Sequence, residues 1–141
     1  MERVGDEQYR TREIQDIRMS KNPTRDDSLR DRLVRSQEVN ISVVGRKSGR
    51  KISIPVWFVW EDGKLYLLPV YGSDTQWYKN VLKNPSMRID VGGAEAEVKV
   101  AALTDGAQVS FVIEKFRGKY GPGDVKKYYS KFDVAVVAQM P

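Results

Sequence analysis

The sequence predicts a mainly β, α+β fold: a small closed or half-open barrel of about six antiparallel strands with short flanking helices. Six short runs are rich in β-branched and aromatic residues, and two of the connections between them are tight glycine turns. Helical periodicity is confined to a few brief segments. At 141 residues, the chain has the length of one domain.

The first three predicted strands form a meander. They cover residues 41–44, 52–60 and 64–70, and the last two are joined by the tight turn Glu61-Asp-Gly63. Apolar residues occupy both faces of the run 52–60, which is typical of a barrel wall that is also covered on its outside. Pro55 cannot donate a ladder hydrogen bond, so it marks a bulge or an edge of the sheet.

The second half of the chain alternates helices with strands. Ser73 or Asp74 can cap the first of these helices, and Asn84-Pro85 ends it. Gly92-Gly93 is a strong signal for a two-residue hairpin turn. The predicted elements are, in order, a helix at 75–83, strands at 87–91 and 95–103, a helix at 107–119, a helical turn at 124–130 and a strand at 132–139.

Residues 1–38 are predicted to be a charged N-terminal helical segment, and residues 39–141 the barrel domain. Thr24 is a candidate N-cap, and the thin apolar stripe of Leu29, Leu33 and Val34 predicts a surface helix. A half-open barrel leaves apolar edges, and a homodimer is one way to cover them.

The composition excludes several classes of chemistry. The chain contains neither Cys nor His, which removes disulfides, thiolate nucleophiles, Ser-His-Asp triads and Cys/His metal sites. No metal site is expected, and any reaction must use carboxylates, Lys, Tyr, backbone donors or a cofactor. No apolar run approaches the length of a transmembrane helix or a signal-peptide core, so a cytoplasmic location is expected.

The stretch Gly45-Arg-Lys-Ser-Gly-Arg-Lys51 stands out between two predicted strands. Its glycines permit a tight turn, and it carries four cations, one hydroxyl and no acid. Such a loop can bind a phosphate or a carboxylate, although a basic solvated turn has the same composition. The net charge of +5 is concentrated here rather than spread over a face with interleaved aromatics. A small anionic ligand is therefore favoured, and no nucleic-acid partner is expected.

Three motifs together resemble the deazaflavin-dependent nitroreductase family. They are Val44-Gly-Arg-Lys-Ser-Gly-Arg-Lys51 with Pro55 in the following strand, Trp77-Tyr-Lys-Asn80, and Lys83-Asn-Pro85. The resemblance covers about residues 41–100. It implies the split β-barrel fold shared with FMN-binding, pyridoxamine-phosphate-oxidase-like proteins. It also implies the 8-hydroxy-5-deazaflavin coenzyme F-420 as cofactor, and hydride transfer to a quinone, a nitro compound or a similar activated acceptor.

The resemblance also implies a set of cofactor-binding residues. The basic loop would hold the phosphate and the tail carboxylates, the strand around Pro55 would lie along the deazaflavin ring, and the loop before the second helix would line the ring edge. Asn80 is expected to hydrogen-bond the loop backbone rather than a substrate. The implied residues are Arg46, Lys47, Ser48, Gly49, Arg50, Ile54, Pro55, Val56, Tyr71, Gly72, Ser73, Trp77 and Asn80.

Two questions stay open at this level. A proton for the reduced acceptor could come from water or from Tyr120, Tyr128 or Tyr129, although tyrosines in such a segment are more often core or rim residues. A basic hairpin on this barrel could equally serve the single phosphate of FMN. The alternatives are therefore an FMN-binding reductase on the same fold, or a non-catalytic flavin- or anion-binding module.

Overall fold

The computed structural model describes residues 25–140 and contains a closed antiparallel barrel of six strands in the order β1-β2-β3-β6-β5-β4. This confirms the predicted fold class. The strands are β1 (Glu38–Val44), β2 (Lys51–Glu61), β3 (Lys64–Leu67), β4 (Ser86–Val91), β5 (Ala94–Leu103) and β6 (Ala135–Gln139). The helices are α1 (Arg25–Arg35), the short 3-10 helix η1 (Gly72–Asp74), α2 (Gln76–Lys83), α3 (Gly106–Tyr120) and α4 (Pro122–Tyr128).

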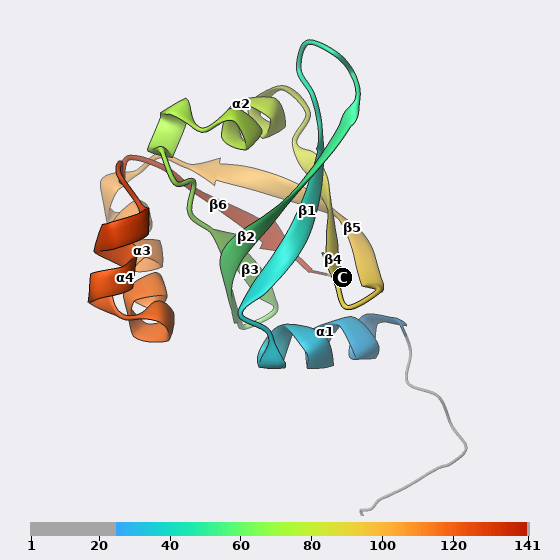
Figure 1. Ribbon diagram of the computed structural model, residues 1–141, viewed down its shortest axis with the longest axis horizontal. Coiled ribbons are helices and arrows are strands. Elements are labelled where there is room, and N and C mark those ends of the chain that lie inside the picture. Colours follow the sequence, from blue (N-terminus) through green and yellow to red (C-terminus); the bar gives the residue numbers. More distant parts are fainter. Residues whose placement is uncertain (1–24, 141) are drawn as a thin grey trace, which may run out of the picture.

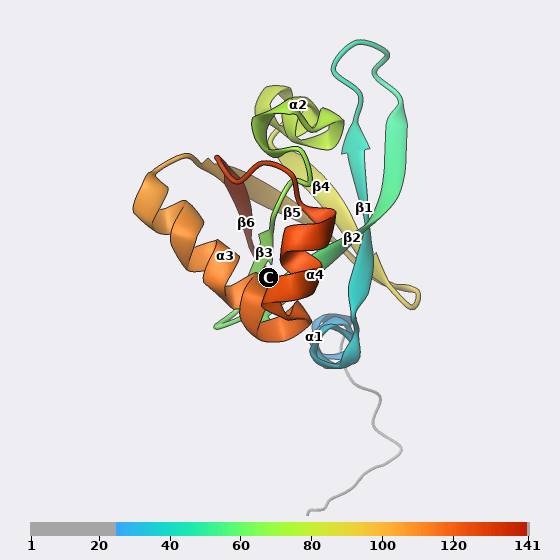
Figure 2. The same ribbon diagram turned by 60° about the vertical axis from the view of Figure 1, so that its left-hand side comes forward.

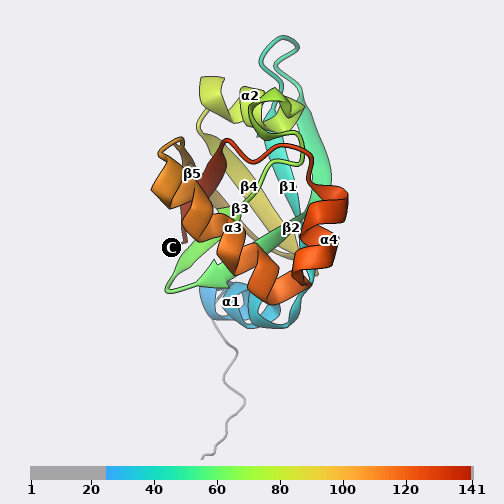
Figure 3. The same cartoon turned by 90° about the vertical axis from the view of Figure 1, so that its left-hand side faces the viewer.

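The helices occupy three positions around the barrel. Helix α1 lies across one end and α2 near the other, while α3 and α4 pack side by side on the outside of the wall (Figure 1, Figure 3). The β1–β2 hairpin projects beyond the barrel on the side of α2 (Figure 2). Of the charged segment expected over residues 1–38, residues 1–24 lie outside the described range.

Helix α1 contributes directly to the barrel core. Leu29 and Leu33 are each only 1% exposed and belong to the same apolar cluster as Ile41, Phe58 and Leu65. Val34 is 71% exposed, so the predicted apolar stripe is narrower than expected. Helix α1 therefore covers one end of the core and packs as part of the barrel. Burying each of its two leucines stabilises the fold by about 1.5–3 kcal/mol.

A second apolar cluster joins the outer face of the wall to α3 and α4. Val112, Phe116 and Val125 from these helices pack against Val59 and Tyr66 of the sheet. The inner face of β2 carries Phe58, which is fully buried in the barrel interior. The apolar character of both faces of β2 therefore has the predicted cause, a core on each side of one strand.

Although the six strands close into a barrel, the wall is split beside the N-terminal half of β2, where β2 and β3 are not paired. The β2–β3 ladder runs only from the pair Glu61↔Lys64 to the pair Phe58↔Leu67, whereas β1 pairs with β2 as far as Lys51. The chain leaves β3 at Leu67, before Pro69, and the N-terminal half of β2 has no ladder partner on this side within the described chain. Pro55 lies in that half, and at an edge its missing N–H costs no ladder bond. Of the two predicted alternatives for Pro55, a bulge or an edge, the structure shows the edge.

Candidate functional site

The hairpin between β1 and β2 is closed by its own backbone. Gly45 N donates to Arg50 O (2.8 Å) and Gly49 N donates to Gly45 O (2.9 Å). Gly49 has φ +72°, a conformation that favours glycine. Ser48 Oγ accepts a hydrogen bond from Arg50 N (3.1 Å), so some of its hydrogen-bonding capacity is used within the loop.

Arg46 fastens the hairpin to α2. Its backbone N–H and its guanidinium Nη1 both donate to Asn80 Oδ1, at 3.1 and 2.8 Å. Its Nη2 donates to Gln76 Oε1 (2.8 Å). Asn80 is 4% exposed and holds the loop backbone, as expected from the sequence. Arg46 is therefore satisfied by the protein itself and positions the loop.

The other three cations of the hairpin lack such partners in the described chain. Lys47, Arg50 and Lys51 are exposed, and within residues 25–140 their side chains make no ion pair or hydrogen bond. No acidic residue occurs in the loop. These three side chains are consequently available to an anionic ligand.

Replacing Asn80 by leucine is expected to release the hairpin from α2. The change leaves the Arg46 backbone N–H without its acceptor and the guanidinium with Gln76 alone, and it costs about 1–3 kcal/mol. Amide hydrogen exchange at Arg46 should accelerate, while Gly49, bonded inside the loop, keeps its protection. The control Leu82→Ala, at a side chain 57% exposed on the same helix, should leave both rates unchanged. Unaltered exchange at Arg46 would contradict the assigned role of Asn80.

A pocket of about 410 Å³ opens at the split in the wall. It brings together three of the predicted cofactor residues, Pro55, Val56 and Trp77, and two of the predicted tyrosines, Tyr128 and Tyr129. Residues that were not predicted from the sequence complete it: Glu38, Trp57, Leu68 and Val70. The lining is mainly apolar and aromatic, with few polar atoms, which is typical of a ligand site.

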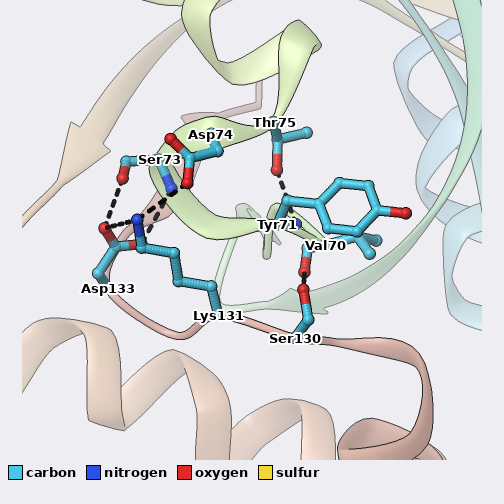
Figure 4. A network of polar contacts seen from close by, with 8 residues as sticks. All are labelled: Val70, Tyr71, Ser73, Asp74, Thr75, Ser130, Lys131 and Asp133. Carbon is cyan, nitrogen blue, oxygen red and sulfur yellow. Dashed lines mark hydrogen bonds and ion pairs between the residues drawn. The ribbon is translucent and has the colours of Figure 1, made fainter.

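The predicted loop residues Tyr71, Gly72 and Ser73 support this pocket and do not line it. Ser73 N and Oγ donate to the Asp133 carboxylate, and the Lys131 ammonium lies between Asp74 (3.0 Å) and Asp133 (3.7 Å) (Figure 4). The hydrogen bond from Ser73 lowers the pKa of Asp133. These contacts tie the loop after β3 to the segment before β6.

Two further contacts, both from Ser130, hold the lining residues Val70 and Tyr129 in the pocket wall. Ser130 N and Ser130 Oγ donate to Val70 O, at 2.9 and 3.3 Å. Gly72 has φ +56°, and a Cβ there would collide with the Asp133 carboxylate. Tyr71 is 61% exposed, and its ring points away from the contacts among Ser73, Lys131 and Asp133 (Figure 4).

Ile54, another predicted cofactor residue, also lies outside the pocket and packs against the barrel core.

The three candidate tyrosines have different environments. Tyr120 stacks on Trp57, with ring centroids 4.2 Å apart, and its hydroxyl is bonded to Phe58 N, Phe58 O and Gln37 O. It does not line the pocket and serves as a structural bridge. Tyr128 is 50% exposed at the pocket. Tyr129 is 5% exposed, lines the pocket, and its hydroxyl bonds to no other described residue.

Lys119 completes the bridge at Tyr120. Its ammonium donates to Ser36 O (3.1 Å) and Phe58 O (2.9 Å) and lies 3.6 Å from the centroid of the Phe58 ring. Burial lowers the pKa of Lys119 to about 8. Neither Lys119 nor Asp133 could be predicted, since a single charged residue on a helix or loop gives no sequence signal of its distant partner.

Stability is expected to depend on the ionisation of Tyr120 at alkaline pH. Burial raises the pKa of Tyr120 to about 12, above the value of about 10 for an unfolded tyrosine. The folded chain therefore favours the neutral phenol, and this stabilisation is present below pH 10 and lost as the pH rises through 12. Urea unfolding at intervals between pH 9 and 12 should show the difference between wild type and Tyr120→Phe narrowing with pH. A constant difference would contradict this role.

Among residues 25–140, no helix is long and apolar enough to cross a membrane. No curated protein matches the sequence. Solved structures of similar fold include an F420-H2 dependent reductase, FDR-A, with 22% identity, 72% of this chain and 93% of that chain covered, and a TM-score of 0.59. They also include the heme storage protein HutZ of Vibrio cholerae, with 12% identity, coverages of 82% and 88%, and a TM-score of 0.62.

A third structure, from Listeria innocua, is of a protein proposed to be a pyridoxamine 5'-phosphate oxidase. It has 15% identity, coverages of 82% and 92%, and a TM-score of 0.60. These three proteins differ in what they bind, so at such identities they establish the split-barrel fold and no shared activity. Residues 30–137 match the DUF2255 family, described as an uncharacterized protein conserved in bacteria. Since this match spans most of the 141 residues, the chain belongs to the DUF2255 family.

Proposed function

We propose that this protein is a reductase that binds the deazaflavin coenzyme F-420 and transfers a hydride to a quinone, a nitro compound or a similar activated acceptor. One observation carries the proposal. The aromatic pocket at the split in the barrel is lined by residues of β2, and the three hairpin cations that are unpaired in the described chain lie at the first residue of this strand or in the turn just before it. A ligand with a flat ring and an anionic tail fits both at once.

The pocket suits the ring. Its volume of about 410 Å³ is in the range of small-molecule sites, and Trp57 and Trp77 provide flat apolar surfaces. The Tyr129 hydroxyl is buried without a partner in the described chain, a situation that costs free energy unless a ligand or water accepts its hydrogen bond. Burial raises the pKa of Tyr129, so at neutral pH the phenol keeps its proton and acts as a donor.

The hairpin suits the tail. Lys51 and Pro55 are four residues apart on β2, which corresponds to about 13 Å along the strand. Lys47, Ser48, Gly49 and Arg50 extend this reach at the tip. Three cations at that distance match a long tail with a phosphate and carboxylates better than the single phosphate of FMN.

Each group of residues then has a role in the reaction. A reduced deazaflavin, when bound, supplies the hydride. Pro55 and Val56 would orient the ring, Trp57 and Trp77 would exclude water from it, and Arg46 with Asn80 would hold the hairpin in place. Tyr128, half-exposed at the pocket, is the candidate to donate a proton to the reduced acceptor. A homodimer and a cytoplasmic location stay predictions.

Fluorescence titration with coenzyme F-420 and with FMN, side by side, tests the proposal. We expect micromolar or tighter binding of F-420 and weaker binding of FMN. Tyr129→Phe should weaken F-420 binding about tenfold, the value of one lost hydrogen bond, with little change in the urea midpoint. Preference for FMN would favour an FMN-dependent reductase on the same fold. Binding of neither would contradict the redox function and leave an anion-binding module.

A further inference from the structure

We propose that a second groove, on the outer face of the barrel beside α3, binds a small amphipathic carboxylate such as an aromatic or fatty acid. The groove has a volume of about 440 Å³ and lies between the first half of α3 and the strands β3, β6 and β5. Among the residues that the structure describes, none lines both this groove and the pocket at the split in the wall. The proposal does not depend on the cofactor assigned above.

The strand register builds an apolar floor. Tyr66 pairs with Val137, and Val137 pairs with Ala101, so these three residues form one row across the three strands on the outer face. Leu103 extends the floor along β5. Ala101 is small and exposed, which leaves the floor open to a ligand.

The next row along the strands is polar and positive. Lys64 pairs with Gln139, and the register Val100↔Ala138, continued by one residue, brings Lys99 beside the same Gln139. With strands about 4.8 Å apart, the two lysine backbones are about 10 Å apart. Both lysines are exposed, and within the described ranges neither forms an ion pair or a side-chain hydrogen bond. Of the residues that the structure describes, no acidic one lines the groove.

Helix α3 supplies an aromatic wall. Phe111 is 55% exposed, and its ring meets Tyr66 edge-on at 6.2 Å between centroids. The Lys115 ammonium lies 4.2 Å from the centroid of the Phe111 ring and is paired with Glu61. An aromatic ring is thus held in place beside an open apolar floor, with Gln108 at its side as a further hydrogen-bonding group.

Charge complementarity favours a small anion over a second copy of this chain. A twofold dimer whose axis passes through the lysine row would place Lys64 and Lys99 of one copy against the same lysines of the other, and the like charges would repel. An acid with a flat or linear apolar body would cover the Tyr66, Val137 and Ala101 row. Its carboxylate would lie at the lysine row.

Titration of the protein with 2-naphthoate, followed by ¹H–¹⁵N NMR, tests the proposal. The amides of Ala101, Gln108, Phe111 and Gln139 should shift on binding. Lys64→Ala/Lys99→Ala should weaken binding of 2-naphthoate about tenfold, because the carboxylate loses its charge partners. The neutral analogue 2-naphthamide should bind the wild type about tenfold more weakly than 2-naphthoate does, because it has no charge to pair with the lysines. The control Arg117→Ala/Lys126→Ala, at the α3–α4 junction, should bind as wild type does. Ala101→Phe should abolish binding with both lysines present.

Several results would overturn the proposal. One is the absence of shifts at the groove amides with millimolar 2-naphthoate. Another is equal binding of the acid by wild type and by the double lysine variant. Shifts confined to Val56 and Val70 would assign the probe to the pocket at the split. If the chemical shifts of the groove amides changed on protein dilution but not on addition of 2-naphthoate, the groove would be a self-association face.

Discussion

Replacing Lys47 and Arg50 together by alanine is expected to weaken binding of coenzyme F-420 on the order of 100-fold. Each side chain is exposed and unpaired in the described chain, so each can give a charge-assisted hydrogen bond to the anionic tail. Such bonds contribute about 1.5–3 kcal/mol each, reduced by solvent at an exposed site. The loss should diminish as salt concentration rises, because screening weakens the wild-type interaction. Fluorescence titration at two ionic strengths measures both effects.

The control for this experiment removes two cations elsewhere. Arg117→Ala/Lys126→Ala changes the net charge by the same amount at the α3–α4 junction, remote from the hairpin (Figure 1). It should bind the coenzyme as the wild type does. Comparable losses in both double variants would mean that overall charge, rather than the hairpin, governs binding. Normal binding by the hairpin variant would show that Lys47 and Arg50 do not bind the anionic tail of the coenzyme.

Replacing Leu33 by alanine is expected to destabilise the whole barrel by about 2–5 kcal/mol. Leu33 is 1% exposed and packs, with Leu29, into the same core as Ile41 and Phe58. The truncation leaves a cavity at the end of the barrel. Helix α1 can only partly close it, because the hydrogen bond from Lys119 to Ser36 O holds the end of α1 in place. Urea unfolding followed by tryptophan fluorescence should show a lower midpoint in a single transition.

Val34→Ala is the matched control on the next position of the same helix. Val34 is 71% exposed, so its truncation should change the free energy of unfolding by less than about 0.5 kcal/mol. If Leu33→Ala were equally neutral, α1 would be a separate segment, in keeping with a domain boundary at residue 38. A large effect of Leu33→Ala alone would extend the barrel domain to include α1.

The sequence by itself determined the features that depend on neighbours along the chain. Short apolar runs rich in β-branched and aromatic residues and the turn at Glu61-Asp-Gly63 were enough to predict the meander. The missing N–H of Pro55 was enough to predict a bulge or an edge, and the strand pairing decided for the edge. The motif Trp77-Tyr-Lys-Asn80 led to the expectation that Asn80 bonds to a loop backbone rather than to a substrate, and Asn80 accepts from the Arg46 backbone. In each case the chemistry of one residue or one short motif restricts the conformation or hydrogen bonding of the nearby backbone.

Only the tertiary structure decided which distant residues meet. Tyr120 and Tyr129 look equivalent in sequence, yet one bonds to the backbone of Phe58 and the other faces the pocket without a partner in the described chain. Glu38 and Val70 line that pocket because β2 and β3 separate beyond Phe58, a consequence of barrel closure that no local pattern encodes. Periodicity along a chain specifies the face on which a side chain lies. Its partners across the barrel depend on strand order and register, which involve the whole fold.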